Sequence, residues 1–222
     1  TLFNVGLAVA FLPFTNLAAR FVTRMIPERR EPEQRFTGRF LDPGMLNTPA
    51  LALNLAKAEI LGMGRRVKVI MDLSAKPFLQ RDLEALGKIK DLEHEVDDLY
   101  RQISTYLVEI GKRDLSQQQT EEVYLMMHVT KQYEHVAAIV DNEMGPMARR
   151  MIQANISFSE NGAEEVRTYH AKAAKQVSRS LAAFRTGSLD KAQRVTRKQI
   201  KYAKLEGSYR QAHFERIHGA VQ

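Results

Sequence analysis

The sequence predicts an all-α fold, an elongated antiparallel bundle of about five long helices preceded by one membrane-type helix. From residue 48 onward, apolar residues recur three and four positions apart over long stretches, which is the period of one helix face. No stretch alternates apolar and polar residues between turn signals, as a half-buried strand would. Proline, which interrupts helices, is concentrated early, since four of the seven prolines precede residue 48 (Pro13, Pro27, Pro32 and Pro43).

The first 25 residues are expected to be the terminal part of a transmembrane segment. Their least interrupted apolar run is Val5–Phe14, and extension to Val22 admits Asn16 and Arg20; a spanning helix needs about 20 mainly apolar residues. The alternative is a short interfacial or buried helix. Arginines after the run place that side in the cytoplasm (Arg20, Arg24, Arg29 and Arg30).

Residues 26–47 are polar and contain proline and glycine, which predicts a connector, and residues 48–222 are expected to form the bundle. Thr48 is expected to cap the first helix with its hydroxyl, with Pro49 at the first helical position. Ser116 opens the third helix in a capping box with Gln119. Ser159 starts the fourth, which Gly187-Ser188 ends, and the fifth extends to about Ile217. Pro146 is expected to kink the third helix near its end.

Four stripes are expected to face inward. They are Leu53, Ala56, Ile60, Met63, Val67 and Ile70; Ile89, Leu92, Val96, Leu99, Ile103, Leu107 and Ile110; Val123, Met126, Thr130, Tyr133, Ala137, Val140, Met144 and Met147; and Ala163, Val166, His170, Ala173, Val177 and Phe184. Their heptad-like spacing predicts nearly antiparallel packing. The short links at residues 113–115 and 187–188 favour a folded bundle over an extended coiled coil.

The composition limits the chemistry that this chain can perform. It contains 222 residues and no cysteine, which excludes disulfides and thiolate metal sites. No phosphate-binding glycine loop, nucleophile elbow or His-Glu-x-x-His motif occurs, so we expect no enzyme. The net charge is +7, and residues from Glu160 onward carry 13 Lys and Arg against 6 Asp and Glu, so the excess lies in the C-terminal part.

Carboxylates beside the helix seams are the best candidates for a metal site. Glu93 and Asp97 lie four residues apart on one face of the second helix, each directly after a core position. Glu134 has the corresponding place on the third helix, followed by Asp141. Oxygen ligands so placed suit a divalent or transition metal ion completed by a neighbouring helix. Glu134 and Asp141 are roughly 10.5 Å apart along a helix axis, too far for one ion to bind both directly.

Other interpretations of these residues stay open. Acidic side chains beside a seam are commonly solvated or paired with Lys and Arg from the next helix. His94 and His135 flank the acidic positions as further candidate ligands, whereas His170 lies on an apolar stripe and is expected to be packed. The basic fifth helix favours acidic lipid headgroups or an acidic partner helix over nucleic acid, and a solvated basic face is the simplest interpretation.

Several motifs together resemble a known family. The segment Glu93-His-Glu-Val-Asp97-Asp-Leu-Tyr100 resembles the acidic helix motif of PhoU domains, and Tyr133-Glu134-His135-Val136 lies where their second acidic motif occurs. The N-terminal part is similar to the junction in bacterial sodium/phosphate cotransporter family proteins, where the last membrane helix leads into a PhoU-like domain. This similarity rests on Thr1-Leu-Phe-Asn4, Phe11-Leu-Pro13-Phe14, Leu41-Asp-Pro and Thr48-Pro49-Ala50-Leu51-Ala52.

The resemblance implies a cytoplasmic PhoU-like regulatory domain of a sodium-dependent phosphate transporter, which tunes or couples phosphate transport, with bound metal in some members. It implies as partners the transmembrane transporter portion of the same polypeptide, membrane lipid and further copies of the chain. The sequence departs from the family pattern at Ala138, in lacking an acidic pair on the fifth helix, and in ending near Gln222 before a sixth helix. It also lacks the transporter's Gln-Ser-Ser-Ser signatures.

Two alternatives come from other functional classes. One is a structural or dimerising helical module without a ligand. The other is a membrane-tethered sensor whose basic face, including Arg197, Lys198 and Lys201, binds lipid or nucleic acid.

Overall fold

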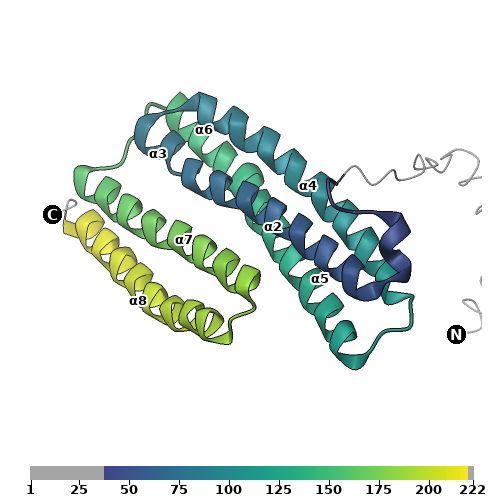
Figure 1. Ribbon diagram of the computed structural model, residues 1–222. Coiled ribbons are helices and arrows are strands. Elements are labelled where there is room, and N and C mark those ends of the chain that lie inside the picture. The colour runs from purple at the N-terminus through teal and green to yellow at the C-terminus, as the bar shows by residue number, and fades with distance from the viewer. Residues whose placement is uncertain (1–37, 220–222) are drawn as a thin grey trace, which may run out of the picture. The chain divides into compact units, whose positions relative to one another are not determined.

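The computed structural model describes residues 38–219, which contain helices and no strand. The chain divides into two units, Thr1–Arg35 and Phe36–Gln222, and residues 38–219 belong to the second (Figure 1). The predicted all-α fold with five long helices is confirmed for this part of the chain. The elements are η1 (Pro43–Asn47), α2 (Pro49–Leu73), α3 (Lys76–Gln80), α4 (Leu83–Gly111), α5 (Gln117–Ala138), the π-helix η2 (Ile139–Met144), α6 (Gly145–Gln153), α7 (Glu160–Thr186) and α8 (Leu189–Gly219).

The predicted membrane-type helix at residues 1–25 lies outside the described residues. Within residues 38–219, every helix is too short or too polar to cross a bilayer. The predicted connector is described only from residue 38, and this part is folded. Residues 38–47, here called the strap, bury Leu41 and Leu46 in the hydrophobic core and form the 3-10 helix η1.

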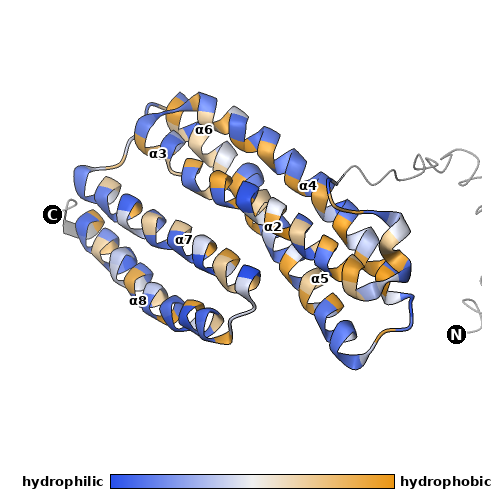
Figure 2. Ribbon diagram, viewed as in Figure 1, coloured by the Kyte–Doolittle hydropathy of each residue, from blue (hydrophilic) through white to orange (hydrophobic). Residues whose placement is uncertain are grey.

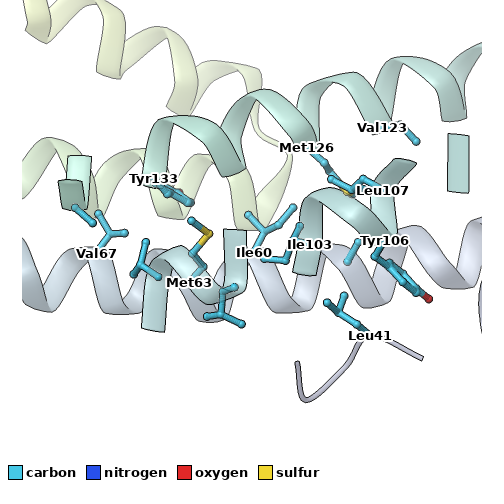
Figure 3. Packing of buried hydrophobic residues seen from close by; sticks show 14 of the residues in the cluster. Leu41, Ile60, Met63, Val67, Ile103, Tyr106, Leu107, Val123, Met126 and Tyr133 are labelled. Atoms are coloured by element: carbon cyan, nitrogen blue, oxygen red, sulfur yellow. The ribbon is translucent and has the colours of Figure 1, made fainter. Parts of the chain in front are cut away.

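Helices α2, α4 and α5 pack against one another and enclose the core (Figure 1). The inward-facing stripe predicted for the first helix is buried throughout, and in the second only Leu92 is half-buried. Figure 3 shows Ile60, Ile103 and Met126 directed toward one another from these three helices. Burial of each such side chain contributes about 1.5–3 kcal/mol, so the regular stripes account for the packing of this bundle.

The helix ends follow the predicted capping residues with one correction. Ser116 and Gln119 form the predicted capping box, and the Ser159 hydroxyl accepts a hydrogen bond from the Gly162 amide. Gly187 ends α7 with φ of 61°, the left-handed conformation that glycine adopts without steric cost. The prediction for Thr48 was wrong in its detail: it is the N-cap residue of α2, but its side chain makes no capping hydrogen bond.

The third predicted helix is divided by a π-helical segment, η2, between α5 and α6. A π turn holds one residue more than an α turn, so it shifts the positions that face inward. The predicted stripe is buried as far as Val140, after which Gly145 and Ala148 are buried and Met147 is 50% exposed. The assignment of Met147 to the core was therefore wrong by one residue. Pro146 lies in the first turn of α6, where its missing N–H is tolerated.

Helices α7 and α8 form a hairpin that lies beside α2, with α7 in contact with α2 (Figure 1). The inward stripe predicted on the fourth helix is only half-buried, and Ala183 alone is buried among the described residues of this hairpin. Hydrophilic residues line most of α8 (Figure 2). The hairpin therefore depends on a small apolar contact and on polar contacts at the α2–α7 boundary.

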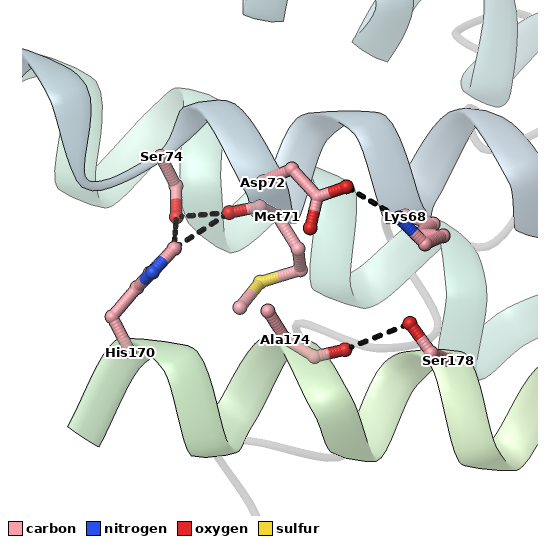
Figure 4. A network of polar contacts seen from close by, with 7 residues as sticks. All are labelled: Lys68, Met71, Asp72, Ser74, His170, Ala174 and Ser178. Atoms are coloured by element: carbon pink, nitrogen blue, oxygen red, sulfur yellow. Dashed lines mark hydrogen bonds and ion pairs between the residues drawn. The ribbon is translucent and has the colours of Figure 1, made fainter. Parts of the chain in front are cut away.

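Close packing at Gly64 and hydrogen bonds of His170 help to attach α7 to α2. Gly64 lies where a β-carbon would come within 2.6 Å of Leu181 Cδ1 on α7 and 2.9 Å of Tyr133 Cε2 on α5. At the end of α2, His170 Nε2 lies 2.7 Å from the Met71 carbonyl oxygen and 3.1 Å from Ser74 Oγ (Figure 4). The predicted packed role of His170 is confirmed.

Candidate functional site

The four carboxylates predicted as metal ligands lie along the α4 and α5–η2 boundary of the bundle. On α4, Leu92 and Val96 point toward the core, so Glu93 and Asp97 lie at its edge. The Glu93 side chain is 14% exposed and that of Asp97 is 41% exposed. Glu93 is thus the more enclosed of these two carboxylates.

Glu134 on α5 and Asp141 in η2 face this same region. The Glu134 side chain is 18% exposed, and Asp141 is half-buried in the π-helical segment. The pKa of Glu93 is raised by its partial burial and then by the negative charge of Asp141, with smaller contributions from Asp97 and Glu134 that oppose His94. The structure therefore brings all four predicted residues into electrostatic contact around Glu93.

Basic side chains already neutralise part of this cluster. Arg101 Nη2 lies 2.9 Å from Asp97 Oδ2, and Lys131 Nζ lies 2.7 Å from Glu134 Oε2. Lys131 also lies over the ring of Tyr100, 5.1 Å from its centroid, and so joins α5 to α4. Both ion pairs lie within a single helix, so these two carboxylates pair with Lys and Arg of their own helix and not, as the alternative prediction had it, of the next helix.

The four carboxylates are suitable metal ligands by type but not by their present separation. Four carboxylates supply the oxygen ligands that hard divalent cations prefer. Among residues 38–219, however, no three His, Asp or Glu side chains are close enough together to hold one ion. Metal binding by Glu93, Asp97, Glu134 and Asp141 therefore stays a prediction, and it requires the carboxylates to move together from the arrangement described.

The two candidate histidines are less suitably placed as metal ligands than the carboxylates. His94 Nδ1 lies 3.6 Å from Glu93 Oε2, while the His94 ring is 65% exposed. His135 is also exposed. Neither is enclosed among the carboxylates in the way that a metal ligand would be.

Sequence reasoning missed two residues at or near functional positions. Lys131 was not recognised as the base that joins the two acidic motifs, although its position three residues before Glu134 is a usual ion-pair spacing. Glu59, 5% exposed, was not singled out, although it directly precedes Ile60 on the core stripe. Its carboxylate accepts a 2.9 Å hydrogen bond from the Phe40 amide of the strap.

Replacement of Glu93 by glutamine is expected to stabilise the protein at neutral pH and not at acidic pH. Because the folded pKa is raised, the ionised carboxylate opposes folding, and stability falls as pH rises from the unfolded pKa of about 4.3 through the folded value. The stabilisation by Glu93→Gln, measured by urea unfolding, should therefore shrink as pH falls through this window. A gain that persists unchanged at pH 3 would contradict the charge mechanism.

Part of the chain matches a known family model. Residues 60–143 match the family model described as PhoU domain. This range begins within α2 and ends within η2, and it includes all four candidate carboxylates. No solved structure matches the chain.

Curated relatives align over nearly the whole chain. A Salmonella typhimurium (strain LT2) protein with the name "Putative inorganic phosphate export protein YjbB" is 27% identical over 218 residues, which cover 97% of this chain and 40% of that protein. The Escherichia coli (strain K12) protein of the same name is 24% identical over 216 residues, with the same shares covered. The chain thus spans about two fifths of the length of these relatives. The part of the chain that matches the PhoU domain model, residues 60–143, lies within the described bundle.

Proposed function

We propose that the bundle is the regulatory domain of a phosphate transport protein and acts on the transmembrane transporter portion of the same polypeptide. The PhoU match and the printed names of the relatives support phosphate as the transported ion. The proposal places the protein in the bacterial inner membrane, with the bundle in the cytoplasm and without an enzymatic activity of its own. Membrane lipid and further copies of the chain are its proposed contacts.

The observation that carries the proposal is the acidic cluster within the matched residues. Partial burial and then repulsion from Asp141 raise the pKa of Glu93, so a divalent cation that binds there would remove repulsion between α4 and the α5–η2 segment. Metal binding would in this way draw the two segments together and change the packing of the bundle. Sodium dependence, implied by the family resemblance, is a further part of the proposal.

The strap offers a route by which such a change reaches the preceding residues. Its backbone is held at three places: the Gly38 amide donates to Gln102 Oε1 at 2.7 Å, the Phe40 amide donates to Glu59 Oε2 at 2.9 Å, and the Tyr106 hydroxyl donates to the Asp42 carbonyl at 2.8 Å. Since Gln102 and Tyr106 belong to α4, a displacement of that helix would move the strap with it.

The double variant Glu93→Gln/Asp97→Asn in the full-length protein is expected to uncouple phosphate transport from regulation. Phosphate flux, measured in both directions with and without sodium, should respond differently to external phosphate in this variant and in the wild type. Asp98→Asn is the matched control, since Asp98 is adjacent but 66% exposed. Wild-type flux and regulation in the double variant would overturn the role of these residues.

The structural module without a ligand is the second candidate, favoured by the ion pairs that Arg101 and Lys131 make within the cluster. The two candidates differ in their response to added Mn²⁺ or Mg²⁺. The regulatory proposal expects a rise in the thermal unfolding midpoint of the wild type and none in Glu93→Gln/Asp97→Asn. An unchanged midpoint in both proteins favours the structural module.

A further inference from the structure

The central part of the α7–α8 hairpin, residues 166–205, contains many more positive than negative side chains. Residues 166–205 hold eleven Lys and Arg and one acidic residue, Asp190, a net charge of +10 in a chain whose total is +7. Asp190 lies at the start of α8 and pairs with Arg194 at 3.1 Å and Arg197 at 3.9 Å. Arg167 pairs with Glu164 just before this stretch. The other cations repel one another, so a bound anion would stabilise the hairpin.

Part of this charge is gathered where the two helices meet. Arg179 Nη1 on α7 donates hydrogen bonds to Gln176 Oε1 at 3.0 Å and to the Tyr202 hydroxyl oxygen on α8 at 3.2 Å. Gln176 Nε2 in turn donates to the Val195 carbonyl at 2.9 Å, which fixes α7 against α8 at this level. The guanidinium and the phenol are thus held together in a half-buried seam.

Two lysines extend the same seam. Lys198 precedes Tyr202 by one turn on α8, and Lys172 precedes Arg179 by two turns on α7. Their charges, together with the hydrogen bond and charge of Arg179, lower the pKa of the Tyr202 hydroxyl, and the hydrogen bond from Arg179 is the largest cause. The phenol oxygen therefore lies in a positive potential from both helices.

The seam has more hydrogen-bond donors than acceptors. Both side-chain hydrogen bonds of Arg179 leave from Nη1, and among residues 38–217 no hydrogen bond or ion pair engages its Nη2 or Nε. Within the same residues, no group accepts the Tyr202 hydroxyl proton, and no carboxylate pairs with Lys172 or Lys198. Glu206, one turn beyond Tyr202, forms its ion pair with Arg210. A ligand that satisfies these groups must present several acceptor oxygens and negative charge.

We propose that Arg179, Tyr202, Lys172 and Lys198 form a binding site for a phosphate-class oxyanion, either free inorganic phosphate or the phosphate of an anionic lipid headgroup. The free edge of the guanidinium matches two oxygens of a tetrahedral anion, and the phenol and the ammonium groups complete its contacts. This site is separate from the acidic cluster, and it does not depend on the proposed transport role.

The first experiment measures binding of inorganic phosphate to the 222-residue chain in mild detergent by isothermal titration calorimetry at constant ionic strength. Loss of a charged hydrogen bond predicts that Arg179→Gln weakens phosphate binding about tenfold or more. Arg194→Gln is the matched control: it removes the same charge from the same hairpin, but its partner is Asp190. Its affinity for phosphate should stay within about twofold of the wild type at constant ionic strength.

A second arm distinguishes the two sources of phosphate. Vesicles of phosphatidylglycerol and of phosphatidylcholine are sedimented with the wild type and both variants. Binding of phosphatidylglycerol that Arg179→Gln abolishes and Arg194→Gln retains, without binding of free phosphate, assigns the site to a lipid headgroup. Equal losses in the two variants, in either arm, would show diffuse charge attraction and overturn the site, and so would absence of binding in both arms.

The phenol supplies a direct signature that does not depend on the stability of the arginine variant. A bound anion compensates the charge of the neighbouring cations, so the lowered pKa of Tyr202 should rise when the bound species is added. The shift is followed by phenolate absorbance at 295 nm. The control is Tyr202→Phe, which keeps the ring, deletes only the hydroxyl and should remove this signal. An unchanged phenolate titration, with the same affinity in Tyr202→Phe as in the wild type, would contradict the site.

Discussion

Replacement of Tyr106 by alanine is expected to lower the free energy of unfolding by about 3–5 kcal/mol, as for other large buried aromatic side chains. The Tyr106 ring is fully buried among α2, α4 and the strap, and its hydroxyl donates to the Asp42 carbonyl. Alanine would remove both the core volume and one of the three hydrogen bonds that hold the strap. Urea unfolding followed by circular dichroism measures the change.

Two controls separate the contributions. Tyr106→Phe keeps the ring and removes the hydroxyl, for which about 1 kcal/mol is expected. Tyr124→Ala makes the same truncation on the outer face of α5, where the side chain is 76% exposed, and should change stability by no more than about 0.5 kcal/mol. A cost for Tyr106→Ala as small as that for Tyr124→Ala would contradict the described core.

The change Gly64→Ala is expected to destabilise the protein by about 1–3 kcal/mol, although alanine favours a helix. The added β-carbon would lie 2.6 Å from Leu181 Cδ1 and 2.9 Å from Tyr133 Cε2, so α7 or the Tyr133 ring must shift. We expect faster amide hydrogen exchange in α7 than in α4 of this variant, because α7 has fewer buried contacts to hold it.

The matched control for Gly64→Ala is Gly87→Ala on α4. A β-carbon at Gly87 meets no atom within 4 Å, so this change should stabilise the protein by up to about 1 kcal/mol through helix propensity alone. The two substitutions are therefore expected to have opposite signs. Stabilisation by both would show that α7 does not approach α2 as described.

The parts of the fold that were predictable are those set by a regular period. The stripes of α2 and α4 are nearly all buried because three-and-four spacing directs side chains to one face, whatever the neighbours are. The capping box at Ser116 and the turn at Gly187 followed from local hydrogen bonding and backbone conformation. Each of these features depends on residues close together in the sequence.

The parts that were not predictable depend on other segments of the chain. The strap packs because Glu59, Gln102 and Tyr106, which lie on two separate helices, meet its backbone. The four candidate carboxylates were identified from helical position alone, whereas the contact of Lys131 with the ring of Tyr100 depends on how α5 packs against α4. The misplacement of Met147 arose because a constant α-helical period was continued through η2.

The π-helical segment also constrains how this protein can vary. Each residue of an α-helix turns the chain by about 100°, so inserting one residue into η2 would rotate all of α6 by that amount relative to α5. Ala148 would leave the interior and Met147 would enter it, beside a space that now accommodates a methyl group. The number of residues between Ala138 and Gly145 is therefore under tighter restriction than their identity, and insertions or deletions there should be tolerated less readily than substitutions.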